Sequence, residues 1–357
     1  MDAGSSHLAR LGAASRPAGS VAAGEARAYC ADVLRGLGFS VREHSFDYSK
    51  FAGAYAAPAA GLCVALFAVA IFILRPLDAS TLSAIGVIAG VVALVFRFVA
   101  GRGVLDLPLA RARGVNLEAT RGEGEPNVWL VAHIDSKWQP VSMIVRVSGV
   151  ILSVIGLVGL ATTSTSTRPV LNALATLFLG VALLGSIPLL LSFVGANNHG
   201  TLDNASGVAT VLAAVESLTA DASIGVVITD AEELALAGAR AWARTRPPGV
   251  ALNCDSVDDD GDLVVMHGAP TPQRLLSAIS GVARETGEPL RIMRLIPGIL
   301  TDHVALASAG WTTLTLSRGT ARTLRRIHTS RDTLATMRGS GIAGAARVLA
   351  RTAAELS

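Results

Sequence analysis

The sequence predicts an α/β fold of three layers, in which helices cover both faces of a central mixed sheet and two transmembrane helical hairpins interrupt the domain. Short apolar segments with strand character alternate with longer segments whose apolar residues recur at helical spacing. This alternation is typical of a sheet that helices cover on both sides. Four long segments without charged residues, arranged in two pairs, predict the hairpins.

The composition indicates that part of the chain lies in lipid. Of the 357 residues, 51% are hydrophobic and only 16% are charged, whereas an average soluble domain carries about 25% charged residues. The formal net charge of +3 is too small to indicate a nucleic-acid partner. The cysteines, Cys30, Cys63 and Cys254, show neither paired nor metal-type spacing, so we expect no disulfide framework and no zinc ribbon.

The N-terminal region begins the soluble part of the chain. Residues 1–20 are rich in glycine, alanine and serine and are expected to be loosely ordered, and no apolar core of a secretory signal peptide follows Met1. Residues 24–37 have the apolar spacing of an amphipathic helix, which Gly38 ends. Residues 40–46 then have strand character.

Four apolar segments have the length of membrane spans. They comprise residues 51–74, 79–96, 147–167 and 169–198. A helix of about 18 residues or more can cross roughly 30 Å of hydrocarbon, although any one of these segments alone would also suit a buried core helix. Four of them in two hairpins favour transmembrane helices, so the lipid bilayer is an expected partner.

The hairpins interrupt the soluble domain without dividing it into several domains. We assign residues 51–100 to the first hairpin and residues 143–198 to the second. The remaining segments, 1–50, 101–142 and 199–357, together have the size of one large domain.

The distribution of positive charge predicts an orientation in the membrane. Each hairpin returns the chain to the side from which it started, so the three soluble segments share one compartment. The opposite loops carry only Arg75 and Arg168. The positive-inside rule therefore predicts an integral protein of the cell membrane whose soluble part is cytoplasmic. The residues counted on the cytoplasmic side are Lys50, Arg97, Arg102, Arg111, Arg113, Lys137 and Arg146.

Within the soluble part, predicted strands alternate with predicted helices. Strand character occurs at residues 115–119, 128–132, 224–229, 250–253, 263–266, 290–295 and 312–316. Helical spacing occurs at residues 204–218, 233–245, 272–286, 302–309 and 338–355.

Histidines and carboxylates occur where predicted strands end. His133 and Asp135 follow the strand at residues 128–132, and Glu232 and Glu233 follow the strand at residues 224–229. Asp255 follows the next strand along the chain, and His328 lies in the loop after the strand at residues 312–316. Because ligands of open α/β sheets gather at the carboxyl ends of strands, these residues are candidates for one site.

A further acidic residue, Asp203, lies in the segment Thr-Leu-Asp-Asn-Ala-Ser-Gly at residues 201–207, directly before a predicted helix. Asn204 or Ser206 is suited to cap that helix, and Gly207 allows its first turn to pack closely against a neighbour. Alone, this segment is also an ordinary loop sequence.

Each candidate has an ordinary structural explanation. A histidine after a strand is usually a loop residue, two glutamates at a helix start favour the helix dipole, and the acid-rich turn after Asp255 is typical of a solvated surface. The joint pattern in a chain with few charges favours a site instead. Zinc accepts imidazole nitrogen and carboxylate oxygen, and a two-metal site uses one carboxylate to bridge the ions.

The order of these motifs resembles the M28 family of zinc aminopeptidases. The matching segments are His133-Ile134-Asp135, Asp203 to Gly207, Glu232-Glu233, Asn253-Cys254-Asp255 and His328 to Thr333, and Thr301-Asp302-His303 resembles a Ser-Asp-His segment of many members. The resemblance covers essentially the whole soluble part of the chain and implies a zinc-peptidase fold.

The resemblance also implies a role for each residue. Two zinc ions per chain would be bridged by Asp203, with His133 and Asp255 completing one ligand set and Glu233 and His328 the other. Asp135 would support His133, and Glu232 would be the general base. Neighbouring residues of an extended chain point in opposite directions, so Glu233 could bind metal while Glu232 reaches the bridging water. The implied activity is hydrolysis of N-terminal residues from peptides with a free N-terminus.

Several features depart from the family pattern. A transmembrane hairpin separates His133 from Asp203, which predicts a metal site close to the membrane surface. Ala231 stands where the family often has glycine, and His199 is either a loop residue, the interpretation we favour, or an additional ligand.

Two other functions stay open beside the aminopeptidase. Glutaminyl cyclases, which are acyltransferases, resemble the same fold, but they usually carry tryptophan where this chain has Ile327. A non-catalytic membrane subunit on a peptidase fold is the third possibility, although such relatives typically lose ligands and all five ligand positions are present here. The sequence leaves the oligomeric state undetermined.

Overall fold

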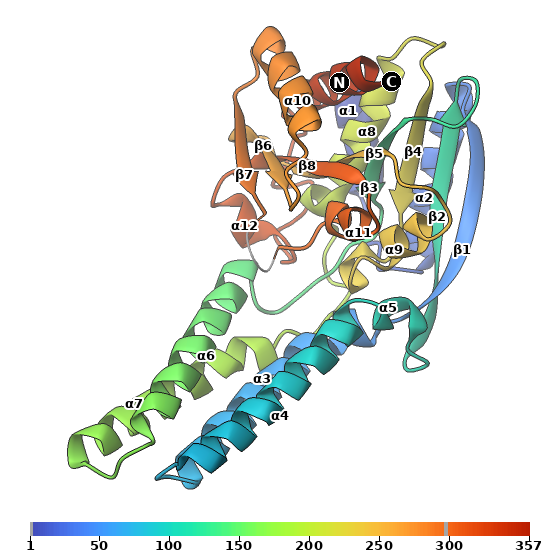
Figure 1. Ribbon diagram of the computed structural model, residues 1–357. Coiled ribbons are helices and arrows are strands. Elements are labelled where there is room, and N and C mark those ends of the chain that lie inside the picture. The colour runs from blue at the N-terminus through green and yellow to red at the C-terminus, as the bar shows by residue number, and fades with distance from the viewer. Residues whose placement is uncertain (1–2, 296–298) are drawn as a thin grey trace. The chain divides into compact units, whose positions relative to one another are not determined.

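The computed structural model describes residues 3–295 and 299–357 and divides the chain into two compact units (Figure 1). The first, which we call the α/β unit, comprises Met1–Tyr48, Arg111–Trp138 and Gly195–Ser357. The second, which we call the helical unit, comprises Ser49–Ala110 and Gln139–Val194.

Eight strands form one mixed sheet. They are β1 (Ser40–Ser49), β2 (Arg111–Arg121), β3 (Val128–His133), β4 (Ile224–Thr229), β5 (Val250–Val257), β6 (Asp262–His267), β7 (Leu290–Arg294) and β8 (Thr312–Gly319). Their order across the sheet is β1-β2-β4-β3-β5-β8-β6-β7. The central strands β4, β3, β5 and β8 are parallel, whereas β2 and β6 run antiparallel to their neighbours β4 and β8. The carboxyl ends of the four central strands therefore meet at one edge.

Helices cover both faces of this sheet (Figure 1). One face carries α1 (Ala3–Leu11), α2 (Val21–Gly36), α8 (Ser206–Glu216), α10 (Gln273–Thr286) and α13 (Ile342–Leu356), and the other carries α9 (Ala237–Ala243) and α11 (Asp302–Ser308). Side chains of β3 alternate between the two cores: Leu130 joins the larger apolar cluster, whereas Trp129 packs with Trp242 and Trp311. The three-layer α/β/α architecture is confirmed. A short helix, α12 (Thr323–Arg326), precedes the last loop.

The helical unit consists of α3 (Phe51–Ile73), α4 (Ala79–Ala100), α5 (Gly103–Asp106), α6 (Met143–Thr163) and α7 (Pro169–Leu190). All but α5 are long and apolar enough to cross a membrane, with mean hydropathies of 2.2 to 2.4. Helices α6 and α7 approach closely through small residues, since a Cβ atom added at Gly156 would lie 2.3 Å from the backbone nitrogen of Ala182.

The second hairpin differs from the sequence expectation at its ends. Helix α6 begins before residue 147 and includes Arg146, whose side chain donates to the Gln139 side chain. The sequence expectation began the span after Arg146, because an uncharged stretch starts there. A charged residue is nevertheless compatible with the first turn of a helix, so α6 begins earlier. Helix α7 ends at Leu190, because residues 191–198 continue as a turn and an irregular segment.

The expectation that residues 1–20 are loosely ordered was wrong. Residues 3–11 form α1, and Arg16 is almost fully buried, with 1% of its surface exposed. Its guanidinium group donates to the carbonyl oxygens of five residues, so the segment is tied to the rest of the α/β unit. The acceptors are Leu11, Ala14, Ile134, His199 and Gly200.

The helix expected at residues 233–245 is also interrupted. A short 3-10 turn at Glu232–Leu234 precedes α9, and Ala235 and Leu236 between them have left-handed backbone with φ of 71° and 61°. Residues with positive φ cannot continue a right-handed helix. The apolar periodicity of this segment reflects burial of both short elements and not one continuous helix.

Replacing Arg16 is expected to destabilise the α/β unit. Arg16→Met leaves several buried carbonyl oxygens without a donor, which should lower the free energy of unfolding by on the order of 3 kcal/mol. Denaturant unfolding followed by fluorescence of the tryptophan cluster measures this change. Arg10→Met is the matched control, because Arg10 is exposed at the end of α1, and equal effects of the two changes would contradict the expectation.

Candidate metal centre

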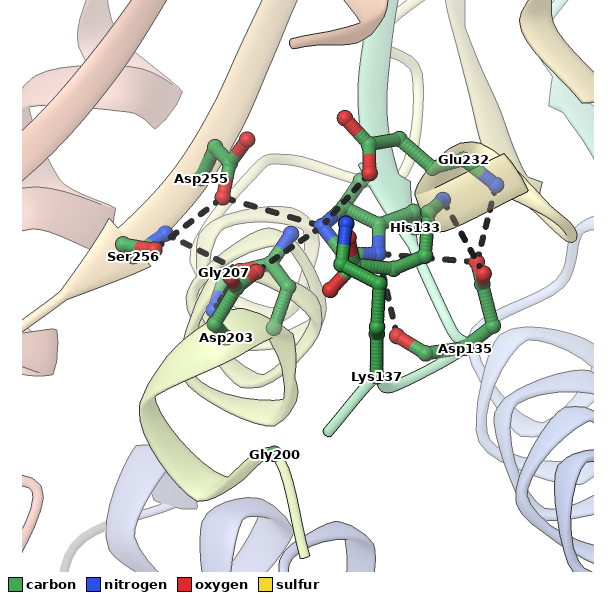
Figure 2. A network of polar contacts seen from close by, with 12 residues as sticks. His133, Asp135, Lys137, Gly200, Asp203, Gly207, Glu232, Asp255 and Ser256 are labelled. Carbon is green, nitrogen blue, oxygen red and sulfur yellow. Dashed lines mark hydrogen bonds and ion pairs between the residues drawn. The ribbon is translucent and has the colours of Figure 1, made fainter. Parts of the chain in front are cut away.

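The candidate site lies at the carboxyl ends of the central parallel strands. His133 is the last residue of β3, and Asp255 lies near the end of β5, where an irregular register with β8 begins at Cys254. Glu232 and Glu233 follow β4. Figure 2 shows His133 surrounded by Asp203, Asp255 and Glu232. The structure therefore brings together residues that the sequence placed at separate strand ends.

Asp203 lies in the irregular segment Thr201–Ala205, which leads directly into α8 and in which Asp203 and Asn204 have non-helical backbone, with φ of −118° and −136°. Its backbone N–H and that of Leu202 donate to the carboxylate of Asp332, at 3.1 Å and 2.5 Å. The Asn204 side-chain oxygen accepts from the backbone N–H groups of Gly207 and Ser256, at 2.9 Å and 3.1 Å. The N-cap of α8 is Ala205, without a side-chain cap hydrogen bond, so neither Asn204 nor Ser206 occupies the expected cap position. These contacts fix the backbone on both sides of the Asp203 carboxylate.

Gly207 permits close packing at the start of α8, as expected. A Cβ atom at this position would lie 2.1 Å from the Asn204 side-chain oxygen and 2.5 Å from the carbonyl oxygen of Cys254. Such distances exclude a side chain, so only glycine lets the Asp203 turn lie against the end of β5.

Glu232 and Glu233 diverge because they occupy a tight turn, and not because the chain is extended. Ala231 begins this turn with left-handed backbone at φ 58°, a conformation that glycine adopts most easily. The carboxylate of Asp135 accepts the backbone N–H groups of Glu232 and Glu233 at 3.0 Å and 3.1 Å. Asp135 thus holds the turn, and its Oδ1 atom also lies 3.5 Å from Nδ1 of His133.

The Asp203 carboxylate lies between two histidines. Its Oδ1 atom is 3.2 Å from Nε2 of His133, and its Oδ2 atom is 3.1 Å from Nε2 of His328. One carboxylate therefore presents a different oxygen to each side of the site, which is the arrangement that a bridging ligand requires.

The remaining donors fall on the two sides of Asp203. Nε2 of His133 lies 3.7 Å from Oδ1 of Asp255 and 3.8 Å from Oε2 of Glu232, whereas Nε2 of His328 lies 3.0 Å from Oε1 of Glu233. Two groups each place one donor atom per residue within 4.8 Å of the others: His133, Glu232 and Asp255, and Asp203, Glu233 and His328.

Burial gives these groups unusual acid–base properties. Burial and neighbouring carboxylates, opposed by His133, raise the pKa of Glu232 well above its ordinary value. Burial raises the pKa of Asp302 to about 7. Burial also opposes ionisation of Asp203, but its close contacts with His133 and His328 lower its pKa below the ordinary value. A site with this excess of buried carboxylates is stabilised by cations.

Two buried donor atoms without hydrogen-bond partners are a further observation, separate from the distances, that fits a metal centre. Nε2 of His133 and Oε1 of Glu233 are buried and make no hydrogen bond with any residue in the described ranges. Buried polar atoms normally have a partner, so two such atoms that face the site are suited to bind an ion. Nitrogen and carboxylate oxygen are donors that zinc accepts.

The chain belongs to peptidase family M28. The model of this family matches residues 116–353, which include every candidate ligand. The resemblance inferred from the motifs is therefore confirmed. Among curated protein sequences, none matches this chain.

Solved structures of low sequence identity share the fold. The aminopeptidase from Aneurinibacillus sp. strain AM-1 is 13% identical with a TM-score of 0.58, over 98% of this chain and 93% of that chain. BSAP, a zinc aminopeptidase from Bacillus subtilis, is also 13% identical with a TM-score of 0.58, over 99% of this chain and 94% of that chain. The glutaminyl cyclase of Fimbriiglobus ruber is 13% identical with a TM-score of 0.58, over 100% of this chain and 95% of that chain. At this identity the likeness establishes the fold.

Sequence reasoning missed residues that support the site. Lys137 was counted as a membrane-flanking charge, yet its Nζ atom lies 2.7 Å from Oε2 of Glu233. Asp332 and Arg16, which contact the backbone around Asp203 and after His133, had no assigned role. Lys137 had a usable signal, because it lies two residues after Asp135, as Asp135 does after His133. Asp332 had one as well, because it lies within the matching segment His328 to Thr333.

His199 is exposed, and its carbonyl oxygen accepts from Arg16, which agrees with the loop interpretation. The structure brings together all seven candidate site residues. They are His133, Asp135, Asp203, Glu232, Glu233, Asp255 and His328.

Asp135→Asn is expected to lower the free energy of unfolding by about 1–3 kcal/mol, because the amide presents N–H donors to one of the two backbone N–H groups that the carboxylate accepts. Chemical unfolding measures the change. Asp259→Asn is the control, since Asp259 accepts the backbone N–H groups of Arg338 and Ser340 at a more exposed position. If both variants lose the same stability, burial of the Asp135 contacts is not the cause.

Proposed function

We propose that this chain is a membrane-anchored, zinc-dependent aminopeptidase that removes N-terminal residues from peptides with a free N-terminus. The supporting observation is the Asp203 carboxylate, whose two oxygens lie 3.2 Å and 3.1 Å from the Nε2 atoms of His133 and His328. Membership of peptidase family M28 and the likeness to two aminopeptidases support the same function.

We assign one zinc ion to His133, Asp203 and Asp255, and a second to Asp203, Glu233 and His328. When bound, the two ions would polarise the scissile carbonyl group and lower the pKa of the attacking water. The buried setting of these ligands keeps bulk water from weakening the electrostatic interactions of the site.

Glu232 is the proposed general base. Its Oε2 atom lies 3.8 Å from Nε2 of His133, close to the 3.7 Å of Asp255, so the carboxylate lies beside the zinc ion that we assign to His133, Asp203 and Asp255. Burial raises the pKa of Glu232, which suits a group that takes a proton from water and passes it to the leaving amine. Asp135 holds the Glu232 turn through the two backbone N–H groups, and so orients the base.

Metal analysis together with one substitution tests this function. The detergent-purified chain is expected to hold about two zinc ions and to hydrolyse aminoacyl reporter amides. Glu232→Gln should keep the metal and lose hydrolysis by about 100-fold or more, because the base is removed and the ligands stay. Glu285→Gln, at an exposed ion pair with Arg351, is the control.

Other results would support a different function. The glutaminyl cyclase of Fimbriiglobus ruber is as similar in structure as the aminopeptidases are, so cyclisation of an N-terminal glutamine peptide is measured in parallel. Cyclisation without hydrolysis would establish acyl transfer. Metal binding with neither reaction would support a non-catalytic membrane subunit.

We propose that α3, α4, α6 and α7 span the cell membrane and that the soluble part is cytoplasmic. The length and hydropathy of these helices support the spans. Lys137 no longer counts toward the orientation, because its charge is paired with Glu233. The remaining positive residues still favour the cytoplasmic side over the loops that carry Arg75 and Arg168.

A reporter fused after Ser357 tests this orientation. A cytoplasmic reporter is expected to be active and an exported reporter inactive at this position. Fusions in the loop at residues 164–168, which lies between α6 and α7, should give the opposite pattern. Export-dependent signal from the C-terminal fusion would reverse the assignment.

A further inference from the structure

Lys137 continues the alternation that brings His133 and Asp135 to the site. Its Nζ atom lies 2.7 Å from Oε2 of Glu233, and only 12% of its side chain is exposed. Three side chains spaced two residues apart thus contact the turn of Glu232 and Glu233. The imidazole of His133 lies near Glu232, the carboxylate of Asp135 accepts both backbone N–H groups, and the ammonium group of Lys137 pairs with Glu233.

The backbone at Lys137 is fixed. Its carbonyl oxygen accepts from the side chain of Asn198 at 2.8 Å, and the carbonyl oxygen of Asn198 accepts from the Ser136 hydroxyl at 3.1 Å. Trp138 and Gly195 exchange two backbone hydrogen bonds, at 3.0 Å and 2.9 Å. A long flexible side chain therefore starts from an anchored position, which lowers the entropy lost when its ammonium group is held at Glu233.

The two oxygens of Glu233 have different surroundings. Oε2 is engaged by Lys137, whereas Oε1 faces Nε2 of His328 at 3.0 Å and has no hydrogen bond to any residue that the structure describes. The carboxylate can therefore offer one oxygen to a cation while the other is held. Without Lys137, Oε2 would lose this contact while Oε1 still faces His328, and repulsion from Asp203 would favour other rotamers of Glu233.

We propose that Lys137 is a positioning residue that holds Glu233 as a one-oxygen ligand and thereby sets the zinc affinity of the group formed by Asp203, Glu233 and His328. This inference rests on the two-ion site of the proposed function. Groups that orient a metal ligand from outside typically change metal affinity by about 10- to 100-fold. The ammonium charge of Lys137 also repels a bound cation, which lowers zinc affinity. The direction in which zinc affinity changes when Lys137 is replaced therefore shows whether orientation of Glu233 or charge repulsion dominates.

Zinc content and chelator competition on the full-length protein test the proposal. Lys137→Met is expected to weaken one of two zinc ions about 10- to 100-fold and to leave the other unchanged. Lys137→Arg should restore most of the affinity, since a guanidinium group can also hold Oε2. The control is Lys50→Met, at the chain's only other lysine, which is exposed and should bind zinc as the unchanged chain does.

Double variants identify the affected ion. In a His328→Gln background, which lacks a ligand of the second group, Lys137→Met should not alter the ion that remains. In an Asp255→Asn background, Lys137→Met should weaken the remaining ion. If the effects of Lys137→Met and His328→Gln on zinc affinity are non-additive, whereas those of Lys137→Met and Asp255→Asn are additive, Lys137 acts on the group formed by Asp203, Glu233 and His328.

Three results would overturn the proposal: unchanged zinc affinity in Lys137→Met, tighter binding, or a loss that persists in the His328→Gln background. If Lys137→Met does not give folded protein, Lys137→Gln is compared in the same way. An unchanged chain that holds at most one zinc would refute the two-ion function. The Lys137 proposal would then be judged by whether Lys137→Met weakens that single ion.

Discussion

Repulsion among buried carboxylates is the constraint on which the site depends. Asp203, Glu232, Glu233 and Asp255 lie together at one sheet edge, each almost without exposed surface. Carboxylates in such surroundings stay in place only where backbone donors or cations stabilise the charge. The mixed sheet supplies the positions, because its central parallel strands end at the same edge, and the turns between elements supply the donors.

Two carboxylates that bind backbone N–H groups hold this arrangement. Asp135 accepts the N–H groups of the Glu232 turn, and Asp332 accepts those at Leu202 and Asp203. Each joins segments far apart in the sequence, so ligand geometry is set by the backbone and does not depend on the metal alone. This use of backbone donors makes the site preorganised.

The order of strand ends made most of the site predictable from sequence, since His133, Glu233 and Asp255 each follow an apolar strand. The sheet order and the burial of α1 were not predictable in this way. Positive φ at Ala235 and Leu236 gives no periodic signal, so a helix was expected where two short elements occur. Lys137 shows a further limit, because counting charges does not reveal which of them are neutralised by a buried partner.

The paired backbone hydrogen bonds between Trp138 and Gly195 have an evolutionary consequence. The 56 residues between them, 139–194, enter and leave the α/β unit through two adjacent positions that a tight turn could join equally well. An ancestor with a plain reverse turn there could therefore have gained the apolar segment by a single insertion, without a change in the order of its strands.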